Sequence, residues 1–240
     1  MRNIWTIALR EFKAYYTSAI GYVVMAAWML FTGVIFFLVV SSPNAIASMD
    51  PLFRNNAILL VFMLPLLTMR LLAGERAGDQ GTGTIEILLT SPVSEWELVL
   101  GKFVGAMLYL VSMIIGSLVF PIALQVVGDP AVGNVIAGYV GFLLFGGYVL
   151  AFGLLMSSLT NSQIVAAITS VVGLLVLWLI RFFSEMPGKW GEFLAWWSMM
   201  RHHEDFWRGL ITLVDVAWYL SFIFFFLFLA KQVIASSRWR

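Results

Sequence analysis

Six long apolar runs constrain what this chain can fold into more than any other feature of its sequence. A helix needs about 20 apolar residues to cross a hydrocarbon core that is about 30 Å thick. The runs occupy residues 19–40, 57–72, 103–127, 135–156, 164–183 and 216–235. Backbone groups inside a bilayer must be satisfied by the chain itself, and these runs lack the short alternation of barrel strands. The sequence therefore predicts an all-α integral membrane protein with six transmembrane helices.

The composition fits a membrane solvent and excludes several kinds of chemistry. Hydrophobic residues make up 61% of the 240 residues and charged residues 11%, whereas soluble domains hold about 25% charged residues. The net charge of +1 gives no reason to expect a nucleic-acid partner. There is no cysteine, and the two histidines, His202 and His203, are adjacent without further ligands at a metal-binding spacing. We therefore expect no metal, no cofactor and no catalytic residues in this chain.

The basic residues are distributed unevenly between the two sides that six spans define. Six spans place both termini on one side, and nine of the 14 basic residues fall there: Arg2, Arg10, Lys13, Arg70, Arg76, Lys102, Lys231, Arg238 and Arg240. The opposite side holds Arg54, Arg181, Lys189, Arg201 and Arg208. Lysine and arginine are enriched in cytoplasmic loops. We predict a multi-pass protein of the inner (cytoplasmic) membrane with both termini in the cytoplasm.

Two segments outside the spans mix apolar and charged residues within the single domain that we expect over residues 1–240. Residues 1–17 carry Trp5 and Phe12 beside Arg10, which predicts an N-terminal interfacial helix; a merely polar flank of the first span explains the pattern as well. Residues 184–215 combine tryptophans with charges and form the predicted external loop. Interfacial helices and ordinary aromatic anchoring are both compatible with that loop.

The cytoplasmic segment 74–101 is the most informative part of the chain. Three glycines lie in residues 78–83, and a short apolar stretch follows over residues 84–90. The stretch ends before Pro92, because the residue before a proline disfavours helix. Ser94 and Glu97 have the spacing of a capping box, which predicts a new helix beginning at Ser94 and continuing into the third span. The segment is either a handle that a cytoplasmic partner pushes or a structural loop.

These residues resemble the type-2 ABC exporter permeases. The resemblance is carried by residues 65–70, 73–76, 83–94 and 99–102, and towards the C-terminus by residues 206–209 and Asp215. Within that family the sequence is similar to the branch of permeases associated with gliding motility. Gly74 departs from the family pattern, which has a second acidic residue before Glu75. The glycine-rich run at residues 78–83 is a second departure.

The resemblance implies the type-2 ABC exporter permease architecture of six transmembrane helices, with an N-terminal interfacial helix and a cytoplasmic coupling helix. It implies a second permease, either a copy or a relative, and a dimer of cytoplasmic ABC ATPases. The implied ATPase-coupling residues are Glu75, Arg76, Thr84, Ile85, Glu86, Leu88, Leu89, Pro92 and Glu97. The chain has no phosphate-binding G-x-x-x-x-G-K-[ST] loop. ATP and Mg²⁺ are therefore expected on the partner ATPase, and this chain is not expected to be an enzyme.

The function that we expect is that of the membrane-spanning permease subunit of an ABC-2 type transporter. It would transmit ATP-driven motion to export a substrate or to drive an envelope process such as gliding motility, with membrane lipid as its remaining partner. A non-ABC scaffold or an ion-driven carrier is the alternative, and an intramembrane enzyme is a third. The spans carry no acidic residue near their middles, which argues against a proton-coupled carrier. The carboxylates of segment 74–101 lack a partner nucleophile, which argues against catalysis.

Overall fold

A computed structural model describes residues 2–41, 48–76, 94–128, 130–184, 186 and 188–237. Within these ranges the regular structure is helical, and six helical segments are long and apolar enough to cross a membrane. The segments are α2 (Ala19–Val40), α3 (Asp50–Thr68), α6 (Glu95–Ser117) continued by α7 (Val119–Val127), α8 (Val132–Leu159), α9 (Gln163–Ser184) and α12 (Leu213–Ser237). The predicted all-α membrane architecture with six spans is confirmed.

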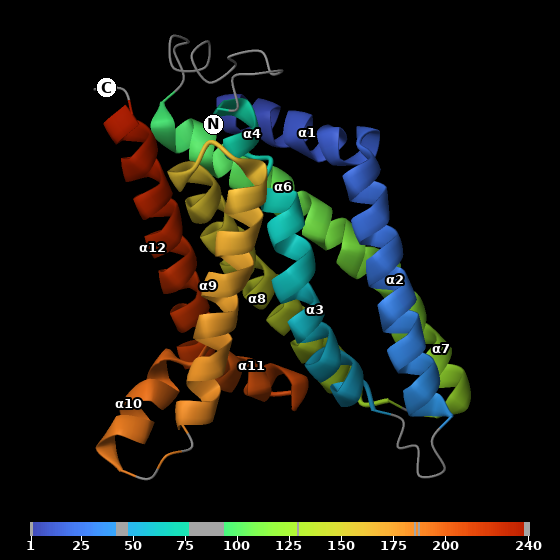
Figure 1. Ribbon diagram of the computed structural model, residues 1–240. Coiled ribbons are helices and arrows are strands. Elements are labelled where there is room, and N and C mark those ends of the chain that lie inside the picture. The colour runs from blue at the N-terminus through green and yellow to red at the C-terminus, as the bar shows by residue number, and fades with distance from the viewer. Residues whose placement is uncertain are drawn as a thin grey trace.

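The shorter helices lie at the two ends of this bundle (Figure 1). At one end, α1 (Arg2–Thr17) lies across the bundle beside α4 (Ala73–Arg76), the start of α6 and the end of α12. We call this the α1 end. At the opposite end, α10 (Lys189–Trp197) and α11 (Met199–Trp207) cover the start of α12 and the end of α9. We call this the α11 end.

The α8 helix forms the centre of the core, in contact with α3, α6, α9, α11 and α12. Its buried aromatic residues pack edge-on against neighbouring rings; Phe142 contacts Trp28 of α2 and Phe53 of α3 in this way. Tyr148 likewise packs on Phe226 of α12. Edge-to-face aromatic pairs add to the stabilisation that burial alone provides. The other spans therefore assemble around α8, and their outward faces are left to the lipid.

The second span begins and ends earlier than the apolar run suggests. The structure places α3 at Asp50–Thr68 rather than at residues 57–72, with a proline in its first turn. Proline suits that position, because its missing N–H has no intrahelical partner there. Asn56 is buried in α3, where its side-chain amide donates to the hydroxyl of Thr32 in α2 at 3.0 Å. A polar residue that is buried in α3 explains why hydrophobicity alone misplaced the start of this helix.

The third span is broken at Leu118, where we predicted one continuous helix to residue 127. The α6 helix ends at Ser117 and α7 starts at Val119. Pro121 has no N–H to donate to the carbonyl of Ser117 four residues earlier. The hydroxyl of Tyr139 donates to that carbonyl instead, at 3.0 Å. The break therefore follows from a proline in the apolar run together with a tyrosine from α8 that satisfies the freed carbonyl.

Both mixed segments fold into helices. The α1 helix buries Ile7, Ala8 and Tyr15 and exposes Trp5, so one face packs on the bundle and the other points away. Residues 184–215 contain α10 and α11, and α10 exposes Trp190 and other aromatic side chains. The two ends of the bundle are thus built from amphipathic helices, as their mixed sequences indicate.

Candidate functional site

The predicted coupling residues are divided between the described and the remaining parts of the chain. Thr84, Ile85, Glu86, Leu88, Leu89 and Pro92 lie outside the described residues, so their coupling role stays a prediction. Glu75 and Arg76 are the last two residues of α4, and Glu97 is in the first turn of α6. Helices α4 and α6 both lie at the α1 end (Figure 1). The described residues that flank segment 77–93, Arg76 and Ser94, therefore both lie at this end.

The start of α6 has the capping box that its sequence predicts. The backbone N–H of Glu97 donates to the hydroxyl oxygen of Ser94 at 3.2 Å, and the backbone N–H of Ser94 donates to the Glu97 carboxylate at 3.1 Å. The side-chain amide of Asn3, in α1, donates to the other Glu97 oxygen at 3.2 Å. Capping satisfies backbone donors that the first turn leaves free. Glu97 therefore fixes the start of α6 and connects it to α1.

A buried ion pair connects α1 and α6 one turn further along. The Lys102 ammonium lies 3.1 Å from a carboxylate oxygen of Glu11, with the Lys102 side chain 1% exposed and that of Glu11 13% exposed. The Arg10 guanidinium contacts the same carboxylate at 2.9 Å. Burial alone raises the pKa of Glu11, but Lys102 and Arg10 outweigh it, and the net pKa is lowered. Glu11 is therefore a carboxylate held in place by two cations.

Two glycines let α1 approach α6 closely enough for this pair to form. A Cβ atom at Gly101 would lie 2.7 Å from Cβ of Ile7, and one at Gly105 would lie 2.9 Å from the carbonyl oxygen of Ala8. Both distances are too short for real side chains. The G-x-x-x-G spacing of these residues therefore serves packing inside the chain.

The turn that leads from α3 into α4 is held by one serine of α8. The Ser157 hydroxyl accepts hydrogen bonds from the backbone N–H groups of Leu72 and Ala73, at 3.2 and 3.0 Å, and donates to the carbonyl of Met69 at 3.2 Å. Ser157 is fully buried. A buried donor or acceptor that loses its partner costs about 1–3 kcal/mol. The central helix therefore holds the chain just before the predicted coupling segment.

The packing of α4 against α9 explains the glycine at position 74. A Cβ atom at residue 74 would lie 3.1 Å from Nε2 of Gln163, the first residue of α9. The glycine lets α4 lie close to that helix start. The close contact between α4 and α9 thus explains why a glycine, and not the acidic residue of the resembled family, stands at position 74.

These contacts form what we call the α1-end frame, whose members are Asn3, Glu11, Ser94, Glu97, Lys102 and Ser157. Only Glu97 among them was singled out from the sequence as a coupling residue. The frame fixes both points where segment 77–93 joins the bundle: one to α8 through Ser157, the other to α1 through Lys102 and Glu97. Satisfied polar contacts that are buried or partly buried favour one arrangement. The frame therefore holds the residues on both sides of segment 77–93 against α8 and α1.

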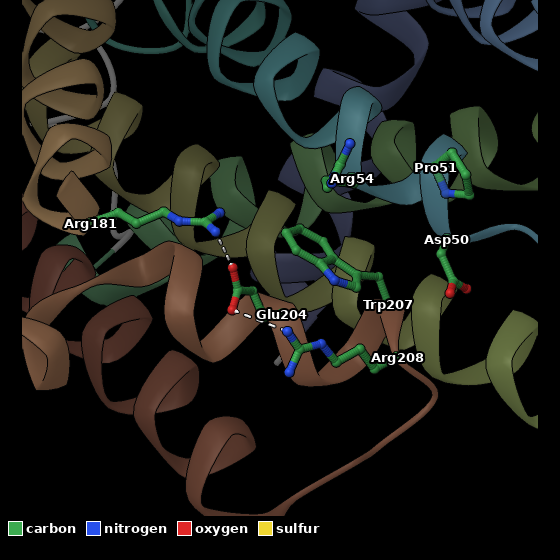
Figure 2. Close-up of a pocket in the computed structure, with 7 residues that line it drawn as sticks. All are labelled: Asp50, Pro51, Arg54, Arg181, Glu204, Trp207 and Arg208. Atoms are coloured by element: carbon green, nitrogen blue, oxygen red, sulfur yellow. Dashed lines mark ion pairs between the residues drawn. The ribbon is translucent and has the colours of Figure 1, made fainter. Parts of the chain in front are cut away.

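The α11 end has a different kind of polar site. A cavity of about 350 Å³ is lined by Asp50, Pro51, Arg54, Arg181, Glu204, Trp207 and Arg208. Figure 2 shows Arg181 and Arg208 both reaching Glu204, with the indole of Trp207 between the arginines and α3. The Arg181 guanidinium lies 2.5 Å from the Glu204 carboxylate, and the Arg208 guanidinium lies 3.8 Å from it. Arg181 of α9 is thereby paired with α11.

A histidine–aspartate pair joins α11 to the start of α12 at the same end. Nδ1 of His202 lies 2.6 Å from the Asp215 carboxylate, and its Nε2 lies 3.1 Å from the carbonyl oxygen of Trp196. Thr212 also bonds to Asp215. The His202 ring stacks on the indole of Trp218. Both ring nitrogens of His202 are therefore used to fix α10, α11 and α12 to one another.

His203, the neighbouring residue, turns into the aromatic core. Its ring lies 4.8 Å from that of Phe145 and 5.4 Å from that of Trp207, measured between centroids. Complete burial lowers the pKa of His203 to about 3. The ring is therefore neutral at physiological pH and acts as part of the packing between α8 and α11.

Comparison with known proteins identifies the class to which this helical bundle belongs. Residues 52–200, more than half of the chain, match the family described as ABC-2 family transporter protein. The chain is 29% identical over 223 residues to "Probable ABC transporter permease protein NosY" of Stutzerimonas stutzeri, which covers 87% of this chain and 75% of that protein. It is 28% identical over 149 residues to "Probable multidrug ABC transporter permease YbhR" of Escherichia coli (strain K12). That alignment covers 59% of this chain and 40% of the YbhR protein.

The bundle is thus a multi-pass membrane protein, and the chain belongs to the ABC-2 family of transporter proteins. The predicted family is confirmed at this level. The matched residues run from α3 to the first residues of α11 and include Lys102 and Ser157 of the α1-end frame. Glu11, the partner of Lys102, lies before them. The narrower resemblance to gliding-motility permeases is not among these findings and stays a prediction.

Proposed function

We propose that this chain is the membrane-spanning permease subunit of an ABC exporter and that a separate cytoplasmic ATPase drives it. The observation that carries the proposal is the α1-end frame, which anchors the two joints of segment 77–93 to α8 and α1 by polar contacts that are buried or partly buried. Membership of the ABC-2 family supports a transport role. The excess of basic residues at this end supports its placement in the cytoplasm.

In this proposal the ATPase dimer grips segment 77–93 when it closes on ATP. Motion of the segment reaches α6 through the capped start at Ser94, and the Lys102–Glu11 pair makes α1 move with α6. Motion at the other joint reaches α8 through Ser157. A second permease, either a copy of this chain or a relative, completes the pathway. The central position of α8 means that its displacement changes the packing of the whole bundle.

The substrate follows from neither the fold nor the frame. The relatives include one named as a multidrug permease, and export of an amphiphilic molecule is consistent with a lipid-facing helical bundle. An envelope process such as gliding motility remains the narrower prediction from the sequence motifs. Both uses need the same transmission from a cytoplasmic ATPase to the bundle.

Replacement of the apolar anchors of segment 77–93 tests the proposal. Interface energy concentrates in a few packed side chains, so Leu88→Ser with Leu89→Ser, or Glu86→Lys alone, is expected to weaken ATPase association by about tenfold. Affinity pull-down of the ATPase from membranes with matched levels of the permease measures this. Glu95→Gln is the control, because it removes a charge beside the capping box without touching the Ser94 and Glu97 bonds. Full association and full ATP turnover in the Leu88/Leu89 variant would contradict the proposal.

A further inference from the structure

The cavity at the α11 end has the charge and position of an anion site. It is lined by three guanidinium groups and two carboxylates, which leaves an excess of one positive charge. Both carboxylates already have partners: Glu204 pairs with Arg181 and Arg208, and Asp50 accepts a hydrogen bond from the side-chain amide of Asn134. In the described part of the chain, Arg54 has no ion-pair partner within 4 Å and its side chain is exposed. A guanidinium group is thus available at the cavity.

The pairing within the cavity leaves a second guanidinium only loosely held. Arg208 lies 3.8 Å from Glu204 and is 63% exposed, whereas Arg181 lies 2.5 Å from the same carboxylate. An exposed ion pair at the longer distance contributes little. Arg208 can therefore turn from Glu204 to an incoming anion, while Arg181 keeps Glu204 in place. Arg54 and Arg208 come from α3 and α11, so an anion between them would join two helices that the chain itself connects only through packing.

The cavity lies where two of the candidate spans end. Its residues come from the first turns of α3, the last turn of α9 and the end of α11, and both α3 and α9 are candidate membrane spans. The neighbouring α10 helix exposes Trp190 and Trp196, and Phe182 beside Arg181 is exposed as well. Exposed aromatic side chains at span ends mark the headgroup level of a bilayer. Guanidinium groups match the oxygens of a phosphate in geometry and charge.

We propose that the cavity between α3, α9 and α11 binds a phosphate group through Arg54 and Arg208, beside the indole of Trp207. The phosphate belongs either to the headgroup of an anionic lipid or to a soluble phosphorylated molecule; both present the same chemistry to the two arginines. The apolar surface around Phe182 would accommodate the acyl part in the lipid case. This inference concerns the α11 end alone and stands independently of any ATPase partner.

Binding of labelled lipid to the purified full-length chain in detergent tests the proposal. The probes are fluorescent phosphatidylglycerol and, as the neutral, phosphate-free control, fluorescent diacylglycerol. We expect the wild type to bind the anionic probe about tenfold more tightly, because charge-assisted bonds to two guanidinium groups are lost with the neutral probe. Arg54→Gln with Arg208→Gln should abolish this preference. Glu204→Gln should strengthen it, since it frees both of its arginine partners, and a merely structural role for these residues predicts no such gain.

A matched control and a competition arm complete the test. Arg201→Gln removes the same charge from α11. Arg201 does not line this cavity but an adjoining one of about 200 Å³, which shares Arg181 and Glu204 with it; the variant should keep the preference. Inorganic phosphate and glycerol 3-phosphate are then added to the wild type, and displacement of the probe at low millimolar concentration indicates a soluble ligand, whereas persistence of the probe indicates a lipid. Unfolding temperatures of all variants verify folding. Equal binding of both probes, a preference that survives in the double variant, or a loss as large in Arg201→Gln overturns the proposal.

Discussion

The Lys102–Glu11 pair at the α1 end and the arginine–glutamate pairs at the α11 end lie in opposite surroundings. At the α1 end, the Lys102 ammonium is almost completely buried against Glu11. At the α11 end, Arg181 and Glu204 are partly exposed and Arg208 is largely exposed around an open cavity. Removal of one partner from a buried pair costs about 3–5 kcal/mol, whereas exposed pairs contribute about 1 kcal/mol or less. The α1 end therefore keeps one arrangement, and the α11 end can exchange partners at little cost.

This difference matches what each end is proposed to do. An end that receives motion from another subunit must not absorb it, and buried, satisfied polar contacts resist deformation. An end that binds an anion needs charges that can be redirected, and partly exposed arginines allow this. Removal of polar groups from each end should therefore lower the stability by different amounts.

Glu11→Gln should have the largest effect, because it leaves Lys102 buried without the carboxylate that it contacts. We expect the free energy of unfolding to fall by about 3 kcal/mol, measured by denaturant titration of the purified chain in detergent. Arg10→Gln is the matched control, because Arg10 contacts the same carboxylate but its side chain is 52% exposed. Its replacement should lower the free energy of unfolding by about 1 kcal/mol or less. A Glu11→Gln effect as small as that of Arg10→Gln would show that the α1 end is not the more tightly held one.

The pH dependence of the same pair gives a second readout. The pKa of Glu11 is lowered from its ordinary value of 4.5, since its two cationic neighbours outweigh the effect of burial. A carboxyl group with a lowered folded pKa contributes stability above its unfolded pKa, and this is lost as the pH falls through the folded pKa. The stability difference between wild type and Glu11→Gln should therefore be constant above pH 4.5 and shrink below it. If the stability difference does not change with pH, the ion pair is not its cause.

Ser157→Ala should have an intermediate effect. It removes the acceptor of the Leu72 and Ala73 amides, and we expect a loss of about 2 kcal/mol from these unsatisfied groups. The chain has no cysteine, so a single cysteine placed at Arg76 can report on the turn by its rate of modification by a soluble maleimide. That rate should rise in the Ser157→Ala background. Ser221→Ala is the control, because the Ser221 hydroxyl donates to the carbonyl of Ala217 in the same helix. Equal effects of the two substitutions would exclude the anchoring role of Ser157.

Arg181→Gln should have the smallest effect of the series. Its ion pair with Glu204 is short but partly exposed, and we expect a loss of about 1 kcal/mol or less that decreases further at high salt. Denaturant titrations at low and high ionic strength measure both features. A loss comparable to that of Glu11→Gln, or one insensitive to salt, would show that the α11 end is held as firmly as the α1 end.

Much of the fold could be predicted because its signals are local. The apolar run of the first span coincides with α2, and the Ser94–Glu97 spacing predicts the observed start of the third span within one residue. The break at Leu118 was also accessible from Pro121, which lies inside a run that hydrophobicity alone reads as continuous. The candidate site was less accessible. Glu97 was found from its capping-box spacing to Ser94, but its partner Asn3 lies 94 residues away in sequence.

The solvent, the number of spans and the family of this protein can be predicted from the sequence alone. These follow from hydrophobicity, from the spacing of a few residues along one helix and from short motifs, all of which act over neighbouring residues. Only the tertiary structure decided which polar groups meet: Glu11 with Lys102, Ser157 with the turn after α3, and Arg54 with the α11 cavity. The physical reason is that a buried charge or amide must find a partner wherever packing brings one. The packing around α8 joins residues that are far apart in the chain.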